Sequence, residues 1–258
     1  MKTGKSGTAM TIRDDGIPLS AVLEEPEGEG PFPLAILLHG FTSAKDRPHN
    51  LLAAEAMREA GYATLRFDLY GHGESGGEFR KHTLYKWITN TLAVIDYVRG
   101  LGFGDLTLSG HSQGGLVAAL AAGMEPDRVR GLVLRAPAFM IPRAAREGTM
   151  LGQRFDPEHI PDSVSTIKNL ELDGNYLRVA QTIYAEEAAD RYRGPVLILH
   201  GDEDDTVPAA DSREMAKRYR NCELAVIPGE THHFDRHPDR MREIIRNWME
   251  KQRKERRE

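Results

Sequence analysis

The sequence predicts an α/β fold with a mostly parallel central sheet and helices on both faces. Short apolar runs of strand length alternate with stretches whose apolar residues recur at helical spacing, which is typical of a parallel sheet. The run Leu34–Leu38 (LAILL) fits a strand buried on both faces. Between Ala136 and Gly194 no clear buried strand occurs. We expect one domain over residues 1–258, with a small lid inserted at about 137–194 over the carboxyl ends of the strands, where open α/β sheets bind ligands.

The individual elements follow from apolar periodicity and from turn residues. A hairpin is expected first, because two short runs flank the turn residues Asp14, Asp15 and Gly16. Strands are expected at Thr8–Ile12, Leu19–Leu23, Leu34–Leu38, Ala63–Phe67, Leu106–Leu108, Val129–Leu134, Val196–Leu199 and Leu224–Ile227. Helices are expected at Leu51–Ala60, Leu84–Val98, Gln113–Ala122, Ser212–Tyr219 and Met241–Trp248. The charged residues after the last helix predict a solvated helix end.

Composition excludes several classes of protein. The 258 residues include 34 Lys and Arg against 39 Asp and Glu, a net charge of −5, which argues against a nucleic-acid partner. No apolar run approaches the roughly 20 residues that span a bilayer. Cys222 is the single cysteine, so no internal disulfide can form. Since no signal-peptide stretch opens the sequence, we expect a cytoplasmic protein without membrane, metal or cofactor. The sequence leaves open whether it forms a homodimer.

Residues 110–114 read GHSQG and predict a serine nucleophile at Ser112. The pattern G-x-S-x-G lies between a buried strand and a helix, and a serine on such a tight turn presents its hydroxyl above the sheet. Gly110, Gly114 and Gly115 provide the space that this turn needs. The alternative is that Ser112 only caps the helix.

A serine hydroxyl needs a base and an acid that orients the base. In this architecture the acid precedes the histidine, each after a later strand. HGDEDDTVP follows Val196–Leu199 and points to Asp204, with Asp205 as the nearest rival. GETHHF follows Leu224–Ile227 and points to His232, with His233 as the rival. The histidines of this stretch lack the spacing of a metal site.

Two further glycine-containing loops follow strands. His39-Gly40-Phe41 comes after Leu34–Leu38, so the backbone N–H groups of Phe41 and Gln113 are the expected oxyanion hole. The alternative for this loop is a plain glycine turn with a packed phenylalanine. The stretch DLYGHGESG lacks a nucleotide-binding pattern. We expect it to be structural, with Ser75 outside the chemistry.

The motifs HGF, DLYGHGES, GHSQGG, HGDEDDTVP and GETHHF, in this order, resemble the α/β-hydrolase superfamily over almost the whole chain. The stretches FDLYGHGESGGEF, LVLRAPAF, FDPEHIPD and GNYLRVAQ are similar to the bacterial cinnamoyl (feruloyl) esterases. The resemblance implies the α/β-hydrolase fold and hydrolysis of a small-molecule ester, such as a ferulate, p-coumarate or chlorogenate ester, through an acyl-enzyme.

The same resemblance implies where the substrate binds. It suggests that Tyr176 contacts the phenolic end of the substrate and that Gln181 supports it, with lid packing as the alternative for both. Phe139 belongs to a group of apolar lid residues expected to line the acyl pocket. Arg143 and Arg146 stand where the resemblance places a polar, often acidic residue, which leaves the specific substrate open.

Two alternatives to a cinnamoyl esterase remain open. Within enzymes, the alternative is a broad short-chain carboxylesterase or a monoacylglycerol-lipase-like hydrolase. Outside enzymes, it is a non-catalytic binding relative, which would be expected to have lost the serine, the histidine or the acid. The sequence retains Ser112, Asp204 and His232, which favours the enzyme.

Overall fold

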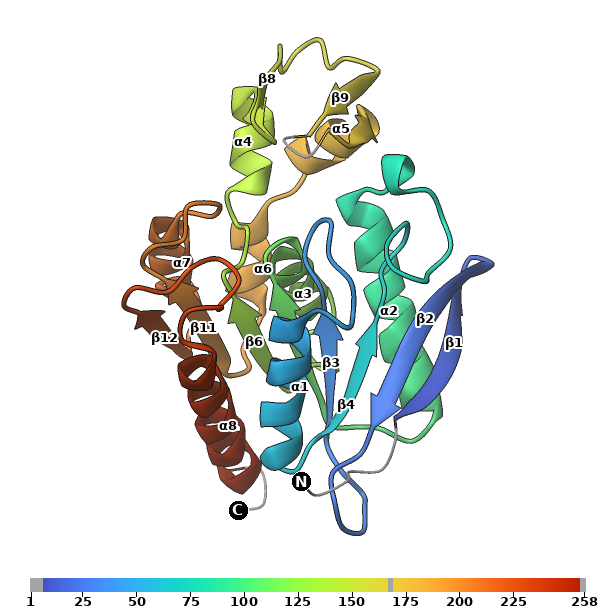
Figure 1. Cartoon of the computed structure of the whole chain (residues 1–258), viewed down its shortest axis with the longest axis vertical. Helices are drawn as coiled ribbons and strands as arrows, with labels where there is room; N and C mark the ends of the chain where they lie inside the picture. The colour runs from blue at the N-terminus through green and yellow to red at the C-terminus, as the bar shows by residue number, and fades with distance from the viewer. Residues whose placement is uncertain (1–6, 167–168, 256–258) are drawn as a thin grey trace.

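An eight-stranded sheet forms the centre of the computed structural model, which describes residues 7–166 and 169–255 (Figure 1). The strand order is β1-β2-β4-β3-β5-β6-β11-β12. Its strands are β1 (Thr8–Asp14), β2 (Ile17–Glu24), β3 (Leu34–Leu38), β4 (Ala63–Phe67), β5 (Leu106–His111), β6 (Gly131–Arg135), β11 (Val196–Gly201) and β12 (Cys222–Ile227). The pairs β1–β2 and β2–β4 are antiparallel and the others are parallel. The predicted mostly parallel α/β fold is confirmed.

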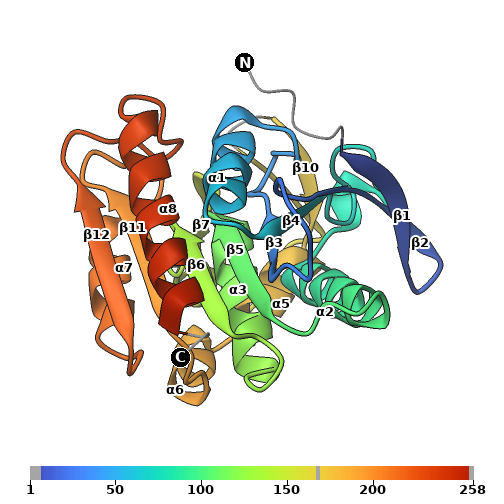
Figure 2. The same cartoon turned by 90° about the horizontal axis from the view of Figure 1, so that it is seen from below.

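Helices cover both faces of this sheet (Figure 2). The helices beside the sheet are α1 (Pro48–Glu59), α2 (Leu84–Gly100), α3 (Gln113–Met124), α6 (Ala185–Arg191), α7 (Ala209–Ala216) and α8 (Pro238–Glu255). On one face, α1 and α8 share a core with Leu37 and Leu199, to which they contribute Met57 and Trp248. The other helices share a second core on the opposite face, to which the sheet contributes side chains such as that of Leu108. This packing fixes the positions of the carboxyl ends of the parallel strands, which together form one edge of the sheet.

Several element boundaries differ from the sequence-based expectation. β5 continues past Leu108 to His111, because Ser109, Gly110 and His111 are buried in the sheet although they are not apolar. α7 begins at Ala209 and ends at Ala216, three residues before the predicted bounds at each end, since Pro208 precedes its first turn. α8 extends well beyond Trp248, to Glu255, and the last three residues of the charged tail lie outside the described part.

Residues 137–194, between β6 and β11, form what we call the inserted segment. It contains α4 (Ile141–Glu147), α5 (Asn175–Gln181), α6 and two small antiparallel sheets, β7 (Thr149–Met150) with β8 (Gln153–Arg154) and β9 (Ser163–Ser165) with β10 (Glu171–Asp173). Figure 1 shows α4, β8, β9 and α5 beyond the carboxyl ends of the central strands. A short 3₁₀ turn, η1 (Phe79–Lys81), precedes α2.

The base of the inserted segment packs closely against the body. A Cβ atom on Gly123 of α3 would lie 2.6 Å from the Cα atom of Ala188 in α6, so the two helices approach at backbone distance. Ala188 and Ala189 are buried there. None of the helices in the described ranges is long and apolar enough to cross a membrane.

Candidate active site

Ser112 stands on a strained turn between β5 and α3. Its backbone has φ 55° and ψ −123°, a conformation that a side chain rarely adopts and that is found at functional sites. The flanking glycines are required by space. A Cβ atom on Gly110 would lie 2.1 Å from the Gly114 carbonyl oxygen, and one on Gly114 would lie 2.2 Å from the His39 carbonyl oxygen. The chain thus presents the Ser112 side chain at the carboxyl end of the sheet.

Potential oxyanion donors surround this serine. Gln113 is the first residue of α3, so its N–H group has no partner within the helix and points along the helix dipole. The loop after β3 lies against the serine, because a Cβ atom on Gly40 would be 3.0 Å from the Cβ atom of Ser112. Phe41 follows directly. The next residue, Thr42, has φ 55° and donates its N–H group to Nε2 of His72 at 3.3 Å.

Asp204 and His232 form a buried hydrogen-bonded pair. Nδ1 of His232 donates to Oδ2 of Asp204 at 2.7 Å, and the Asp204 side chain is fully buried. A carboxylate can only accept, so the imidazole proton is on Nδ1 and Nε2 is available as a base. The neighbouring candidates differ: the Asp205 carboxylate accepts from the Thr206 hydroxyl at 3.1 Å, and both Asp205 and His233 are exposed.

Asp204 is held ionised by its surroundings. Burial alone would raise the pKa of Asp204, but hydrogen bonds from His200 and His232 outweigh it and hold this pKa well below its ordinary value. The other carboxylate oxygen, Oδ1, accepts the N–H groups of Thr206 at 2.9 Å and Val207 at 2.8 Å. An anion in this position can stabilise a protonated His232.

The loop that contains His232 is hydrogen-bonded to the end of β5, the strand that directly precedes Ser112. Nε2 of His111 donates to the His232 carbonyl oxygen at 2.8 Å, and the two rings are 4.8 Å apart. The Ser112 hydroxyl itself makes no hydrogen bond to a described residue. Serine–histidine hydrogen bonds are often long without substrate and tighten when it binds.

The sequence motifs did not predict two positioning residues, His200 and Ser212. His200, at the end of β11, is fully buried, and its Nε2 lies 3.2 Å from Oδ2 of Asp204 and 3.0 Å from the Val207 carbonyl oxygen. Its Nδ1 accepts from the Ser212 hydroxyl at 2.7 Å. The Asp204 carboxylate is therefore shared between two imidazoles. His200 begins the HGDEDD stretch, so the sequence places it close to Asp204. Its contact with the Asp204 carboxylate, however, depends on how the loop folds back.

Of the predicted substrate residues, Tyr176 approaches the nucleophile. Its ring is almost fully buried, and its hydroxyl donates to Oε1 of Gln113 at 2.7 Å. The ring lies 6.4 Å from that of Phe41 and 5.1 Å from that of His82. Phe139 is buried in the same apolar cluster. The inserted segment thus contacts the residue that follows Ser112.

Gln181 and the two arginines connect parts of the inserted segment. Nε2 of Gln181 donates to the carbonyl oxygens of Pro157 at 2.8 Å and Ala145 at 3.2 Å. Arg146 donates to the carbonyl oxygens of Gln181 and Ile183. Arg143 forms an ion pair with Asp211 of α7 at 3.0 Å. The structure does not bring Gln181 together with Tyr176 by a hydrogen bond.

The loop after β4 has structural contacts. The Ser75 hydroxyl donates to the Asp68 carbonyl oxygen at 2.5 Å. The Asp68 carboxylate is buried, accepts the Lys45 N–H group at 2.7 Å and pairs with the Lys45 ammonium at 2.9 Å. Gly73 is needed here, because its φ is 53° and a Cβ atom would lie 2.2 Å from Cγ of Asp68. These bonds connect the loop after β4 to the loop that contains Phe41.

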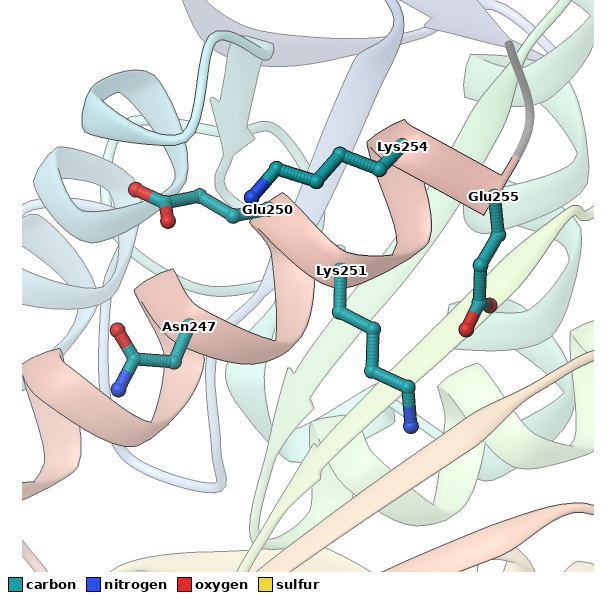
Figure 3. A pocket seen from close by; sticks show the side chains of 5 residues that line it. All are labelled: Asn247, Glu250, Lys251, Lys254 and Glu255. Atoms are coloured by element: carbon teal, nitrogen blue, oxygen red, sulfur yellow. The ribbon is translucent and has the colours of Figure 1, made fainter. Parts of the chain in front are cut away.

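Two surface pockets differ in their lining residues and in their distance from the site. Figure 3 shows one along α8, where all five lining side chains are polar and come from the same helix: Asn247, Glu250, Lys251, Lys254 and Glu255. A second pocket includes Phe41 and His233 among its lining residues and therefore borders the site. Within the described ranges, no three His, Cys, Asp or Glu side chains are grouped so that they could hold a metal ion.

Comparison with known proteins identifies the family. Residues 31–177 match the family model described as serine aminopeptidase, S33. The chain is an α/β-hydrolase of this family. Est1E from Butyrivibrio proteoclasticus, solved with ferulic acid bound, is 48% identical to it over 95% of this chain and 99% of that chain, with a TM-score of 0.92. The predicted membership of the α/β-hydrolases and similarity to bacterial feruloyl esterases are confirmed.

More distant relatives of this α/β-hydrolase are also known. The putative esterase YitV of Bacillus subtilis is 25% identical over 249 residues, 89% of this chain and 86% of that protein. Human palmitoyl-protein thioesterase ABHD10 is 27% identical over 204 residues, 77% of this chain and 66% of that protein. The chain thus spans slightly less than two thirds of the length of this thioesterase.

Proposed function

We propose that this α/β-hydrolase is a cytoplasmic serine esterase that cleaves hydroxycinnamate esters through an acyl-enzyme. The observation that carries the proposal is the strained turn at Ser112 beside the Asp204–His232 pair. The arrangement is that of a nucleophile, a base and an orienting acid. The ferulate acyl group is supported by the 48% identity to Est1E, whose structure contains ferulic acid.

The mechanism has two acyl-transfer steps. Nε2 of His232 takes the proton of the Ser112 hydroxyl as its oxygen attacks the ester carbonyl carbon. The N–H groups of Phe41 and Gln113 stabilise the oxyanion that forms. His232 then protonates the alcohol oxygen, which leaves. Water, deprotonated by the same imidazole, attacks the acyl-enzyme and releases the acid and Ser112.

The inserted segment acts as a lid over the acyl group in this proposal. Tyr176 supports this role, because its hydrogen bond to Gln113 brings the segment next to the reacting carbonyl. Phe139 adds apolar surface from the same segment. The Tyr176 hydroxyl donates to Gln113, and its oxygen remains an acceptor for the phenolic hydroxyl of a substrate.

Replacement of the nucleophile tests the function. We expect Ser112→Ala to lower kcat on methyl ferulate by a factor on the order of 10⁶, because the attacking oxygen is lost. The exposed Ser165 provides a matched control, and Ser165→Ala should retain full turnover. A fluorophosphonate probe should label the native protein and the control but not Ser112→Ala. Wild-type turnover by purified Ser112→Ala would rule out the mechanism.

A substrate comparison separates the two esterase classes. A feruloyl esterase should show a higher kcat/KM on methyl ferulate than on p-nitrophenyl butyrate, because only the first fills an aromatic acyl site. The opposite preference would favour a broad short-chain carboxylesterase or a monoacylglycerol-lipase-like enzyme.

A further inference from the structure

His111 is the last residue of β5 and directly precedes Ser112. Its side chain is almost completely buried, although an imidazole carries two polar nitrogen atoms. Buried polar atoms normally have hydrogen-bond partners, so the surroundings of each nitrogen indicate what the ring does in this place. The two nitrogens of His111 face two different loops of the site.

Nε2 of His111 faces the loop that contains the base. It lies 2.8 Å from the His232 carbonyl oxygen. A carbonyl oxygen can only accept, so Nε2 carries the proton of the neutral ring and donates it. Since the Ser112 hydroxyl makes no hydrogen bond to a described residue, no bond between Ser112 and His232 sets their spacing. The contact of His111 links the strand that precedes the serine to the loop of the histidine.

Nδ1 of His111 faces the loop after β3. A Cβ atom on Gly40 would lie 3.2 Å from this nitrogen and 3.0 Å from Cβ of Ser112. Gly40 directly precedes Phe41, whose N–H group is the proposed oxyanion donor. Nδ1 is buried and has no hydrogen-bond partner in the described ranges, so packing alone determines how closely this loop approaches the ring.

Two further imidazoles pack against His111. Its ring centroid lies 4.8 Å from that of His232 and 4.4 Å from that of His49 in the first turn of α1. The buried Phe234 lies 6.3 Å away in an edge-on orientation. The His111 side chain thus fills the space between α1, the loop after β3 and the loop after β12.

The groups around His111 disfavour its protonation. Burial has the largest effect, followed by the nearby His49, His232 and Arg135, and together they lower the pKa of His111 well below its ordinary value. Arg135 is fully buried at the end of β6 and donates to the His49 carbonyl oxygen at 3.0 Å. No carboxylate in the described part of the chain lies within ion-pair distance of His111. The ring therefore stays neutral near pH 7 and adds no charge beside a protonated His232.

We propose that His111 is a positioning residue that holds His232 and the loop of Phe41 at their working distances from Ser112. The proposal rests on the proposed esterase function and adds a residue on which its rate depends. A histidine that only fills the core would contribute to the free energy of unfolding alone. A positioning residue also determines kcat, because a misplacement of about 1 Å between reacting groups can cost about 100-fold in rate.

Three substitutions separate the hydrogen bond from the shape of the ring. His111→Phe keeps a ring that cannot donate. The amide nitrogen of His111→Gln can take the position of Nε2 and donate to the His232 carbonyl oxygen, whereas the shorter His111→Asn reaches only the position of Nδ1. We expect the Phe and Asn variants to lower kcat on methyl ferulate about 100-fold and to change KM less than about twofold. His111→Gln should recover at least about a tenth of the wild-type kcat, since it restores the donor.

Thr107 provides a matched control on the same strand. It is fully buried near the start of β5, and its hydroxyl has no hydrogen-bond partner in the described ranges. Thr107→Val therefore replaces a buried polar group of β5 with little change in shape, and it should retain the wild-type kcat. Thermal unfolding verifies that each variant is folded. If His111→Phe does not fold, the comparison of His111→Asn with His111→Gln carries the test.

The outcomes distinguish the role of His111 from the function. Wild-type kcat in the folded Phe and Asn variants would overturn the role. An equal loss of kcat in His111→Gln and His111→Asn would also overturn it, because the hydrogen bond would then not matter. Both results leave the esterase function supported while the wild-type enzyme hydrolyses methyl ferulate. Absence of wild-type turnover on every ferulate ester would overturn the proposed function and the role of His111 together.

Discussion

Asp204 accepts from four donors with two oxygen atoms. One oxygen accepts the N–H groups of Thr206 and Val207, and the other accepts from the imidazoles of His232 and His200. Each carboxylate oxygen thus accepts from two donors, which explains why the pKa of this buried carboxyl lies below its ordinary value. The arrangement fixes the rotamer of the acid and, through it, the orientation of the His232 ring.

Removal of this charge should impair catalysis more than folding. We expect Asp204→Asn to lower kcat on methyl ferulate by a factor of about 10⁴, because the amide can donate to the imidazole and favour the wrong tautomer. The adjacent exposed residue gives a matched control: Asp205→Asn should retain kcat. Steady-state kinetics decide the assignment, and a larger loss in Asp205→Asn would exchange the two roles.

Some residues of the site are readable from short motifs, and others are not. Ser112, Asp204 and His232 are predicted from glycine patterns at strand ends, because the tight turns around such residues require glycine neighbours. The contact of His111 with the His232 carbonyl oxygen joins residues 121 positions apart. No local pattern encodes such a contact. The same applies to Tyr176, whose partner Gln113 depends on how the inserted segment folds over the sheet.

At the scale of the elements, the strand β5, its turn and the helix α3 depend on glycine. A Cβ atom on Gly114 would lie 2.2 Å from the His39 carbonyl oxygen, and this backbone atom cannot move without β3. We expect Gly114→Ala to reduce the free energy of unfolding by about 3 kcal/mol or more and to abolish esterase activity. Thermal unfolding and turnover of methyl ferulate measure both effects.

The control for this substitution is a glycine in open space. A Cβ atom on Gly104 would meet nothing within 4 Å, and its φ is not positive. Gly104→Ala should therefore leave activity unchanged and should not lower the free energy of unfolding by more than about 0.5 kcal/mol. Equal stability of Gly114→Ala and Gly104→Ala would contradict the steric argument.

Element types were predictable, whereas their ends were less so. Short apolar runs predicted every strand of the central sheet, and apolar residues at helical spacing predicted most of its covering helices. Both patterns arise because one or two faces of these elements are buried. The end of β5 was missed because Ser109 and His111 are polar and yet buried. The start of α1 was missed because Pro48 opens the helix and carries no apolar signal, although proline favours this position.

At the scale of the whole molecule, buried neutral histidines couple folding to pH. Burial lowers the pKa of His39 and His82 to about 4 and that of His49 to about 3. It also lowers the pKa of His72 to about 2. In the unfolded chain these groups titrate near 6.5. Between these values the unfolded state binds more protons than the folded state, so stability decreases as pH falls.

The expected result is a protein that loses stability in mild acid. The free energy of unfolding should fall by more than about 3 kcal/mol between pH 7 and pH 5, because several histidines each contribute up to about 1.4 kcal/mol per pH unit. Urea unfolding at intermediate pH values measures the slope. In His82→Gln, the slope of the unfolding free energy against pH should decrease by the amount that corresponds to one bound proton. A stability that is independent of pH over this range would contradict the role of burial.

The close approach of α6 to α3 divides the inserted segment into two parts with different freedom to change. Its base shares the core of the body through Gly123 and Ala188, so substitutions there disturb folding. Within its outer part, from α4 to α5, which extends beyond the strand tips (Figure 1), the buried Tyr176 also contacts the body, whereas exposed residues such as Glu158 and His159 can vary with little effect on it. Under the proposed function, substitutions at such exposed positions can therefore alter the lid while the proposed site of Ser112, Asp204 and His232 stays intact.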